Sequence, residues 1–163
     1  MSTAVWQVGS EDGFMACYRA TLAPLYRYAA MLCGDDRSGA EDLVQDVYLA
    51  ALGRARDGSL QELSIGWLVT AARHRHIDRI RSAQRERRRL ELVASTPPHD
   101  EHLAVPERLA ALPERERLAL VLRYVDDLTI AQVARALGAS THAAESLVAR
   151  ATRRLRHQEA HGA

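Results

Sequence analysis

The sequence predicts an all-α protein: two small helical domains joined by a flexible linker, with a helix-turn-helix in the C-terminal domain. Three observations lead to this class. Apolar residues recur every three or four positions along most of the chain, no segment alternates in the manner of a strand, and a polar stretch with two prolines divides the helical regions. Residues 1–93 are expected to form the N-terminal domain, 94–105 the linker and 106–163 the C-terminal domain.

The first helices follow from spacing and from capping residues. Residues 1–10 have no helical pattern and are expected to be a loose arm, and helical spacing begins at Glu11. Pro24 lacks an N–H group and is expected to kink this helix or to start a second one. Ser38 and Glu41 have the spacing of a capping box, so the next helix is expected to begin there and to bury Leu43.

The outward side of that second helix is acidic. It carries Asp42, Gln45 and Asp46, whereas the apolar residues of the same helix point toward a core. Such a surface is either solvated or docked on a basic partner, and the spacing alone leaves both interpretations open.

A third helix is expected at residues 65–89, after a polar connector at residues 53–64. Its apolar residues recur on one side, and the opposite side is expected to carry a basic face made of Arg73, Arg75, Arg79 and Arg81. Trp67, near the start of this helix, could stack on a base or fill the core. A helix with an apolar stripe and a basic face suits contact with a polyanion, although a solvated surface helix is the alternative.

The charge is segregated along the chain, although the formal net charge is only +1. Residues 1–52 contain three arginines and seven acidic residues, whereas residues 53–93 contain ten arginines and five acidic residues. A near-neutral total therefore does not exclude nucleic-acid binding, because the basic charge is concentrated around the third helix.

The C-terminal region has the spacing of a helix-turn-helix. After two short helices between residues 106 and 124, Thr129 and Gln132 form a second capping box that opens a short helix ending at Gly138. Ser140 then caps a final helix from residue 141 to about 156. A short capped helix, a tight turn and a longer helix ending in arginines are typical of this DNA-binding motif, although any helical hairpin could share the pattern.

Several functional classes find no support in the residues. We find no Gly-rich phosphate loop, paired carboxylates or nucleophile–base spacing, so no catalytic residue and no cofactor are expected. His99 and His102 have a metal-compatible spacing without a second pair, and no metal site is expected. Cys17 and Cys33 lack a CxxC spacing, which predicts reduced thiols in a cytoplasmic protein. No apolar run approaches about 18 residues, so no membrane insertion is expected.

In this order, the features resemble the extracytoplasmic-function (ECF) sigma factors, the two-domain class of bacterial transcription initiation factors. The resemblance rests on residues 40–48 (AEDLVQDVY), on Trp67-Leu68, Ala72-Arg73 and Asp78-x-x-Arg81, and on Leu112-Pro113-x-Arg115-x-Arg117 followed by Leu122-Arg123-Tyr124 and the helix-turn-helix. It implies a binding function without catalysis. The implied partners are core RNA polymerase, promoter DNA and an anti-sigma factor.

The resemblance also implies roles for the residues already singled out. It makes the outward side of the second helix a polymerase-binding surface, with Asp42, Leu43, Gln45 and Asp46. It places the connector at residues 53–64 where the family captures a flipped base. Flipping a base out of the stack costs a few kcal/mol, which a pocket and stacking contacts must offset. The implied DNA-binding residues are Trp67, Arg73, Arg75, Arg79 and Arg81 at the minus-ten element and Glu145, Ser146, Ala149 and Arg150 at the minus-thirty-five element.

The last helix departs from the family pattern at Glu145, Leu147 and Ala149, where basic residues and an aromatic residue or histidine are usual. A carboxylate repels phosphate, but it can accept a hydrogen bond from the cytosine amine in the major groove. Glu145 could instead pair with a nearby arginine on the surface. The departure leaves the DNA-binding role in place and the preferred upstream sequence unpredicted.

Two other classes share part of the pattern. A DNA-binding regulator with a helical sensor or dimerisation domain would bind its operator without polymerase, and a helical adaptor would sequester another factor. Co-purification with core polymerase separates a sigma factor from both.

Overall fold

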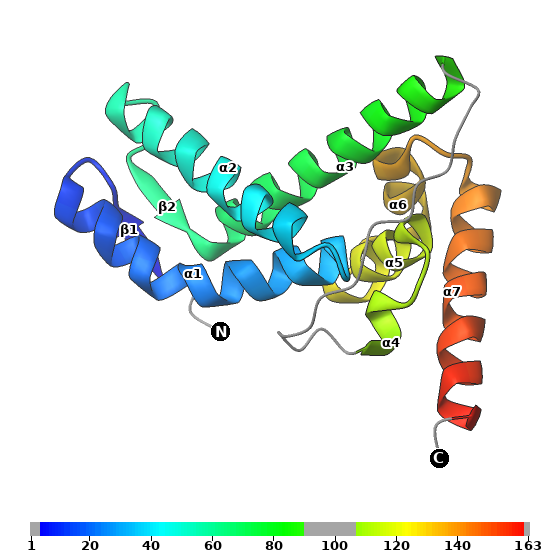
Figure 1. Ribbon diagram of the computed structural model, residues 1–163. Helices are drawn as coiled ribbons and strands as arrows, with labels where there is room; N and C mark the ends of the chain where they lie inside the picture. The colour runs from blue at the N-terminus through cyan, green and yellow to red at the C-terminus, as the bar shows by residue number, and fades with distance from the viewer. Residues whose placement is uncertain (1–3, 90–106, 162–163) are drawn as a thin grey trace. The chain divides into compact units, whose positions relative to one another are not determined.

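The computed structural model describes residues 4–89 and 107–161. Within it the chain forms two compact units, one from residues 1–29 and 38–76 and the other from residues 30–37 and 77–163. The helical class expected from the sequence is confirmed, with the elements labelled in Figure 1. The predicted linker at 94–105 and the domain ends beside it lie outside the described residues, so those boundaries remain a prediction.

Three helices follow one another in the N-terminal part: α1 (Glu11–Cys33), α2 (Arg37–Arg56) and α3 (Ile65–Arg89). α1 continues through Pro24, so of the two expected possibilities, a kink or a new helix, the new helix does not occur. α2 begins at Arg37, which places Ser38 inside the first turn and makes the predicted capping box wrong. Helix α3 has its cap at Ser64, whose hydroxyl accepts a hydrogen bond from the Trp67 amide at 3.3 Å.

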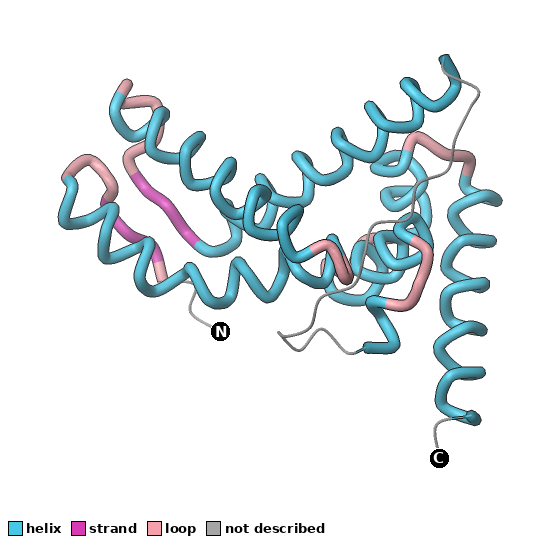
Figure 2. Tube along the Cα trace, viewed as in Figure 1, coloured by secondary structure: helices cyan, strands magenta, loops and turns pink. Residues whose placement is uncertain are grey.

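The expectation of a loose arm at residues 1–10, and of no strand, is wrong for the described part of that segment. β1 (Val5–Gln7) pairs antiparallel with β2 (Glu62–Ser64), with Trp6 opposite Leu63. Figure 2 shows the two strands as a short magenta ribbon. Each strand is only three residues long, and the partners lie more than fifty residues apart, so neither pattern stands out in the sequence.

The first unit is built on a core shared by α1, α2 and β2. Its largest fully buried side chains include Leu25, Leu43 and Leu63. Beside them the Tyr48 hydroxyl is 2.8 Å from that of Thr21, and burial raises the pKa of Tyr48. The aromatic residue that ends the 40–48 segment is therefore a core residue with a satisfied hydroxyl group.

The C-terminal part of the second unit contains α4 (Glu107–Ala110), α5 (Glu114–Leu120), the π-helical turn η1 (Val121–Val125), α6 (Ile130–Leu137) and α7 (Thr141–His161). α7 packs against α5 and α6 (Figure 1). The capping box of Thr129 and Gln132 is present, and Gly138 ends α6 with φ = 59°, as the sequence predicts. The Ser140 hydroxyl accepts from the Ala143 amide at 3.1 Å, which confirms the cap of the last helix.

A buried cation also stabilises the second unit. Arg117 has 5% of its surface exposed and donates hydrogen bonds to the carbonyl groups of Leu32, Cys33, Ala110 and Leu112 at 2.9–3.1 Å. Burial lowers the pKa of Arg117 and raises that of the nearby Cys33 thiol to about 12. Arg117 is thus a structural residue, and Cys33 is a protonated, unreactive thiol.

Two of the expected absences can be compared with the described residues. No helix among them is long and apolar enough to cross a membrane. No group of three or more His, Cys, Asp or Glu side chains in that part of the chain could hold a metal ion, while His99 and His102 lie outside it.

Candidate functional site

The acidic surface of α2 lies within the first unit, above a core side chain. Asp42 and Gln45 are exposed and Asp46 is half-buried, so the predicted outward side is correct as geometry. Leu43 has no exposed surface. It supports this surface from below, which agrees with the core part of its expected role, and its contact with polymerase stays a prediction.

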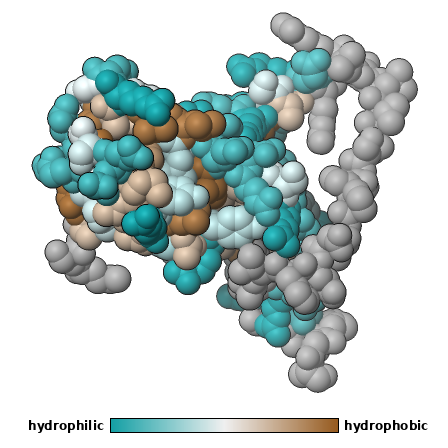
Figure 3. Space-filling view, turned by 60° about the vertical axis from the view of Figure 1, so that its left-hand side comes forward, coloured by the Kyte–Doolittle hydropathy of each residue, from teal (hydrophilic) through white to brown (hydrophobic). Residues whose placement is uncertain are grey.

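An apolar groove of about 650 Å³ runs beside this acidic surface, between α1 and α2. Its lining combines apolar and acidic side chains: Phe14, Met15, Tyr18, Leu22, Tyr26, Glu41, Asp42, Val44, Gln45, Tyr48, Leu49 and Leu52. Leu49 is 60% exposed and contributes to the apolar lining of the groove. The face of the first unit that is turned forward in Figure 3 carries hydrophobic patches among hydrophilic residues. A groove of this kind suits an amphipathic partner with basic residues beside its apolar side.

The four arginines of α3 do not form the single outward face that we predicted. All four are half-buried, whereas His74, Asp78 and Ser82 are exposed. At roughly 100° per residue, Arg73 and Arg81 lie on one flank of the buried stripe and Arg75 and Arg79 lie on the other. The basic charge therefore follows both edges of the helix, and the outermost side is mixed.

Arg81 forms hydrogen bonds within the second unit that bear on its expected contact with DNA. The Arg81 guanidinium donates to the carbonyl groups of Arg135 and Ala136 at 2.7 and 2.6 Å, near the C-terminal end of α6. A cation at this end of a helix is favoured by the unpaired carbonyl groups. A phosphate contact by Arg81 would have to replace these hydrogen bonds. Trp67, at the start of α3, is half-buried, so part of its ring is available to a stacking base.

The predicted DNA-reading residues of α7 divide into two groups. Glu145 and Ala149 are exposed and Ser146 is half-buried, so this part of the helix can face a groove of DNA. Leu147, at a position where the family usually has a basic residue, is buried in the core. Among the described residues Glu145 has no ion-pair partner within 4 Å, which argues against the alternative that it pairs with a surface arginine.

Arg150 is held by a carboxylate that sequence reasoning missed. Its Nε atom is 3.2 Å from Glu116 Oε1, and Arg154 Nε is 3.0 Å from Glu116 Oε2. Only 6% of Glu116 is exposed, so two cations from α7 neutralise a buried anion of α5. Glu116 and Arg150 are 34 positions apart in the sequence, so no spacing rule reveals that they pair. Arg150 therefore has a structural duty besides any contact with DNA.

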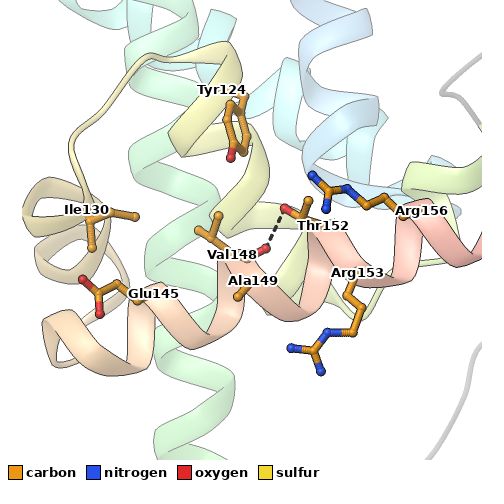
Figure 4. A pocket seen from close by; sticks show the side chains of 8 residues that line it. All are labelled: Tyr124, Ile130, Glu145, Val148, Ala149, Thr152, Arg153 and Arg156. Carbon is orange, nitrogen blue, oxygen red and sulfur yellow. Dashed lines mark hydrogen bonds between the residues drawn. The ribbon is translucent and has the colours of Figure 1, made fainter.

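A second groove, of about 430 Å³, adjoins Glu145. Figure 4 shows its lining, in which Tyr124 and Ile130 face α7 and Glu145, Val148 and Ala149 come from α7 itself. Arg153 and Arg156 lie farther along the same helix. Tyr124 is 65% exposed, and the Arg123 guanidinium lies 5.6 Å from the centre of its ring. The exposed end of the helix-turn-helix thus combines one carboxylate, an aromatic ring and several cations.

Comparison with known proteins gives a consistent result in both halves of the chain. Residues 17–86 match the family model described as Sigma-70 region 2, and residues 102–155 match Sigma-70, region 4. The chain is 31% identical to the ECF RNA polymerase sigma factor BldN of Streptomyces coelicolor, over 91% of this chain and 61% of that protein. It is 32% identical to the ECF RNA polymerase sigma factor SigK of Mycolicibacterium vanbaalenii, over 92% of this chain and 84% of that protein.

A solved structure has the same fold. The sigma factor RpoE of Bartonella quintana, solved in complex with the anti-sigma factor NepR, matches with a TM-score of 0.52 and 26% identity, over 92% of this chain and 96% of that one. Helical regions 2 and 4, in this order, define the class of sigma factors, the transcription initiation proteins that direct core RNA polymerase to promoters. Within that class, the chain belongs to the ECF family of RNA polymerase sigma factors.

Proposed function

We propose that three surfaces of this sigma factor each bind a different partner or promoter element. The acidic side of α2, with the groove beside it, docks on core RNA polymerase. Helix α3 and the connector before it hold the opened minus-ten element, and the start of α7 reads the minus-thirty-five element. The observation that carries this proposal is the position of Asp42 and Gln45 on the rim of an apolar groove inside the region 2 match.

The proposal extends to location, partners and chemistry. The role is binding without a chemical step, in the cytoplasm, where the polymerase works. An anti-sigma factor is the further partner we propose, because the Bartonella quintana relative was solved with one. Apolar and charged side chains meet in both grooves, so either could accept an amphipathic segment of such a protein.

The experiment that tests the function is run-off transcription with purified core polymerase over a randomised promoter library. Transcripts from a defined subset of promoters, absent when the chain is omitted, are the expected result. Operator binding by the chain alone, together with no polymerase-dependent transcript, would support a dedicated DNA-binding regulator instead.

Strand opening should depend on the basic edge of α3 formed by Arg75 and Arg79. Replacing both with Ala is expected to weaken open-complex formation at every promoter, because each lost phosphate contact to single-stranded DNA lowers the slope of log affinity against log salt by roughly 0.7. Permanganate footprinting over a salt series measures that slope. Arg19→Ala with Arg27→Ala, at exposed positions of α1, removes the same charge and should leave the slope unchanged. A slope shared by all three chains would refute the assignment.

Promoter choice should depend on Glu145, the exposed carboxylate of α7 that has no ion pair among the described residues. Glu145→Lys replaces a phosphate-repelling group with an attractive one, so non-specific DNA affinity is expected to rise. The preferred base should shift at one upstream position by about 1–3 kcal/mol of discrimination, because a lysine favours guanine where a carboxylate favours cytosine. Selection of minus-thirty-five sequences with each holoenzyme gives the comparison, and identical base profiles would show that Glu145 reads no base.

A further inference from the structure

The N-terminal arm is built into the first unit, and none of the proposed surfaces uses it. β1 pairs with β2 over the full length of both strands, from Val5 opposite Ser64 to Gln7 opposite Glu62. Two more hydrogen bonds extend the pairing. The Gln7 side chain donates from Nε2 to Glu62 Oε1 at 2.9 Å, and the Val8 backbone amide donates to the Gln61 carbonyl at 2.9 Å. Val8 is buried, which anchors the arm in the core.

The strand that the arm holds is the return leg of the connector. The tip of the connector is tied to itself: Asp57 Oδ1 accepts from the Ser59 amide at 2.8 Å, and Gln61 Nε2 donates to the Gly58 carbonyl at 3.0 Å. Gly58 has φ = 77°, a left-handed conformation that suits glycine. The Arg54 carbonyl, in the last turn of α2, accepts from the Leu60 amide at 2.9 Å, so the tip itself is held by α2. The return leg beyond the tip, residues 61–64, is held by the pairing with β1.

The same pairing reaches the start of α3. Ser64, at one end of the ribbon, caps α3 through the amide of Trp67, and Leu63 before it is almost fully buried. A shift of β2 would therefore move the connector and the first turn of α3 together. Two-stranded ribbons are marginally stable by themselves, so the position of this one depends on the arm remaining in place.

A glycine in α1 makes room for the arm. A Cβ atom at Gly13 would collide with the backbone carbonyl oxygen of Gln7 and would crowd the Ser10 hydroxyl, which caps this helix. Because the obstacle is backbone, no side-chain rotation can relieve it. In an ordinary helix, Gly→Ala is stabilising by about 1 kcal/mol. The arm can therefore pack against α1 at this point only because residue 13 has no side chain.

We propose that residues 5–8 are a brace that fixes the connector and the start of α3, and that this brace sets how sharply the protein discriminates bases at the minus-ten element. The inference rests on the proposed function of the connector and α3. In it, Gly13 and the arm are positioning residues: they touch no DNA, and they act through the placement of residues 57–67.

Gly13→Ala tests the brace with one methyl group. Its matched control is Ala20→Ser, which adds one heavy atom at an exposed position of the same helix. Amide hydrogen exchange should quicken at residues 61–64 in Gly13→Ala and stay unchanged in Ala20→Ser. With core polymerase, the penalty for a mismatched minus-ten base, usually roughly 5- to 150-fold, should fall by about threefold in Gly13→Ala. Polymerase affinity and the minus-thirty-five profile should match the parent.

A deletion of residues 1–7 gives a second test of the brace, which remains valid even if the Gly13→Ala chain does not fold. Together with Gly13→Ala it forms a double-mutant cycle. The deletion should give the same loss of minus-ten discrimination. Adding Gly13→Ala to it should cost nothing further, because the carbonyl group that would collide is gone. Unchanged exchange at residues 61–64 would show that the arm is no brace, and an unchanged minus-ten profile despite faster exchange would show that the brace has no role in discrimination. A parent chain that directs no promoter-specific transcription would instead overturn the proposed function.

Discussion

A chain carrying Asp42→Arg and Asp46→Arg is expected to lose at least about 100-fold in affinity for core RNA polymerase, or roughly 2.7 kcal/mol. Asp42 is exposed at the rim of the groove, and Asp46 is half-buried one turn farther along α2. Reversing two charges sets cations against a surface that should itself be basic, and like-charge contacts across an interface cost several kcal/mol. Titration of a fluorescently labelled chain with core polymerase measures the loss.

The control must carry the same change in charge at another place. Glu11→Arg with Asp12→Arg provides it, because both acids are exposed in the first turn of α1 and neither lines the groove. Asp46 has an intramolecular partner, so Asp42→Arg alone separates docking from packing and should retain most of the effect. If the Asp42 variants bind as tightly as the parent while the control does too, polymerase docks on another surface.

The parts of the fold that the sequence predicts are those with local causes. Thr129 and Gln132 satisfy each other's backbone amides within one turn, and Gly138 takes a left-handed conformation that other residues resist. The start and the end of α6 depend on residues only a few positions apart, so residue spacing alone predicts them. Ser38 is the local failure: α2 starts one residue earlier, at Arg37, and helix ends are the least certain part of any such prediction.

The parts that the sequence could not predict depend on partners far along the chain. β1 exists because β2 lies beside it, and three residues are too few to show alternation. The arginines of α3 are an exception, because no distant partner is involved. The helical angle alone places Arg75 and Arg79 opposite Arg73 and Arg81 across the buried stripe, so the single basic face was an error in counting positions around the helix.

Arg150 shows the same limit at the candidate site. Its place on α7 and its charge both suit contact with DNA, and the sequence predicts that role. The structure adds Glu116, a buried carboxylate on α5 that needs cations near it. Arg150 and Arg154 are each about half exposed, so they form ion pairs with Glu116 on one side and meet solvent on the other. The contribution of Arg150 to stability can therefore be measured separately from its contact with DNA, by comparing the free energies of unfolding of variants.

Removing both arginines is expected to destabilise the second unit much more than removing the acid. In Arg150→Ala with Arg154→Ala, Glu116 remains buried without a cation, and leaving a buried charge uncompensated costs about 3–5 kcal/mol. In Glu116→Gln, the arginines lose a partner but stay hydrated, because 51% and 57% of their side chains are exposed. That change should cost about 1.5 kcal/mol, the lower end of the range for a hydrogen bond to a charged group.

Urea unfolding of the full chain, followed by amide hydrogen exchange in α7, gives the free energy of unfolding of each variant. Arg153→Ala with Arg156→Ala is the matched control on the same helix, since both are exposed and neither contacts Glu116. It should change stability by less than about 0.5 kcal/mol. Adding Glu116→Gln to the Arg150/Arg154 variant should recover part of the loss, because the unpaired charge is then absent. Equal losses for the acid and for the two arginines, without recovery in the triple variant, would show that the carboxylate is not the group the arginines compensate and would return Arg150 to a role in DNA contact alone.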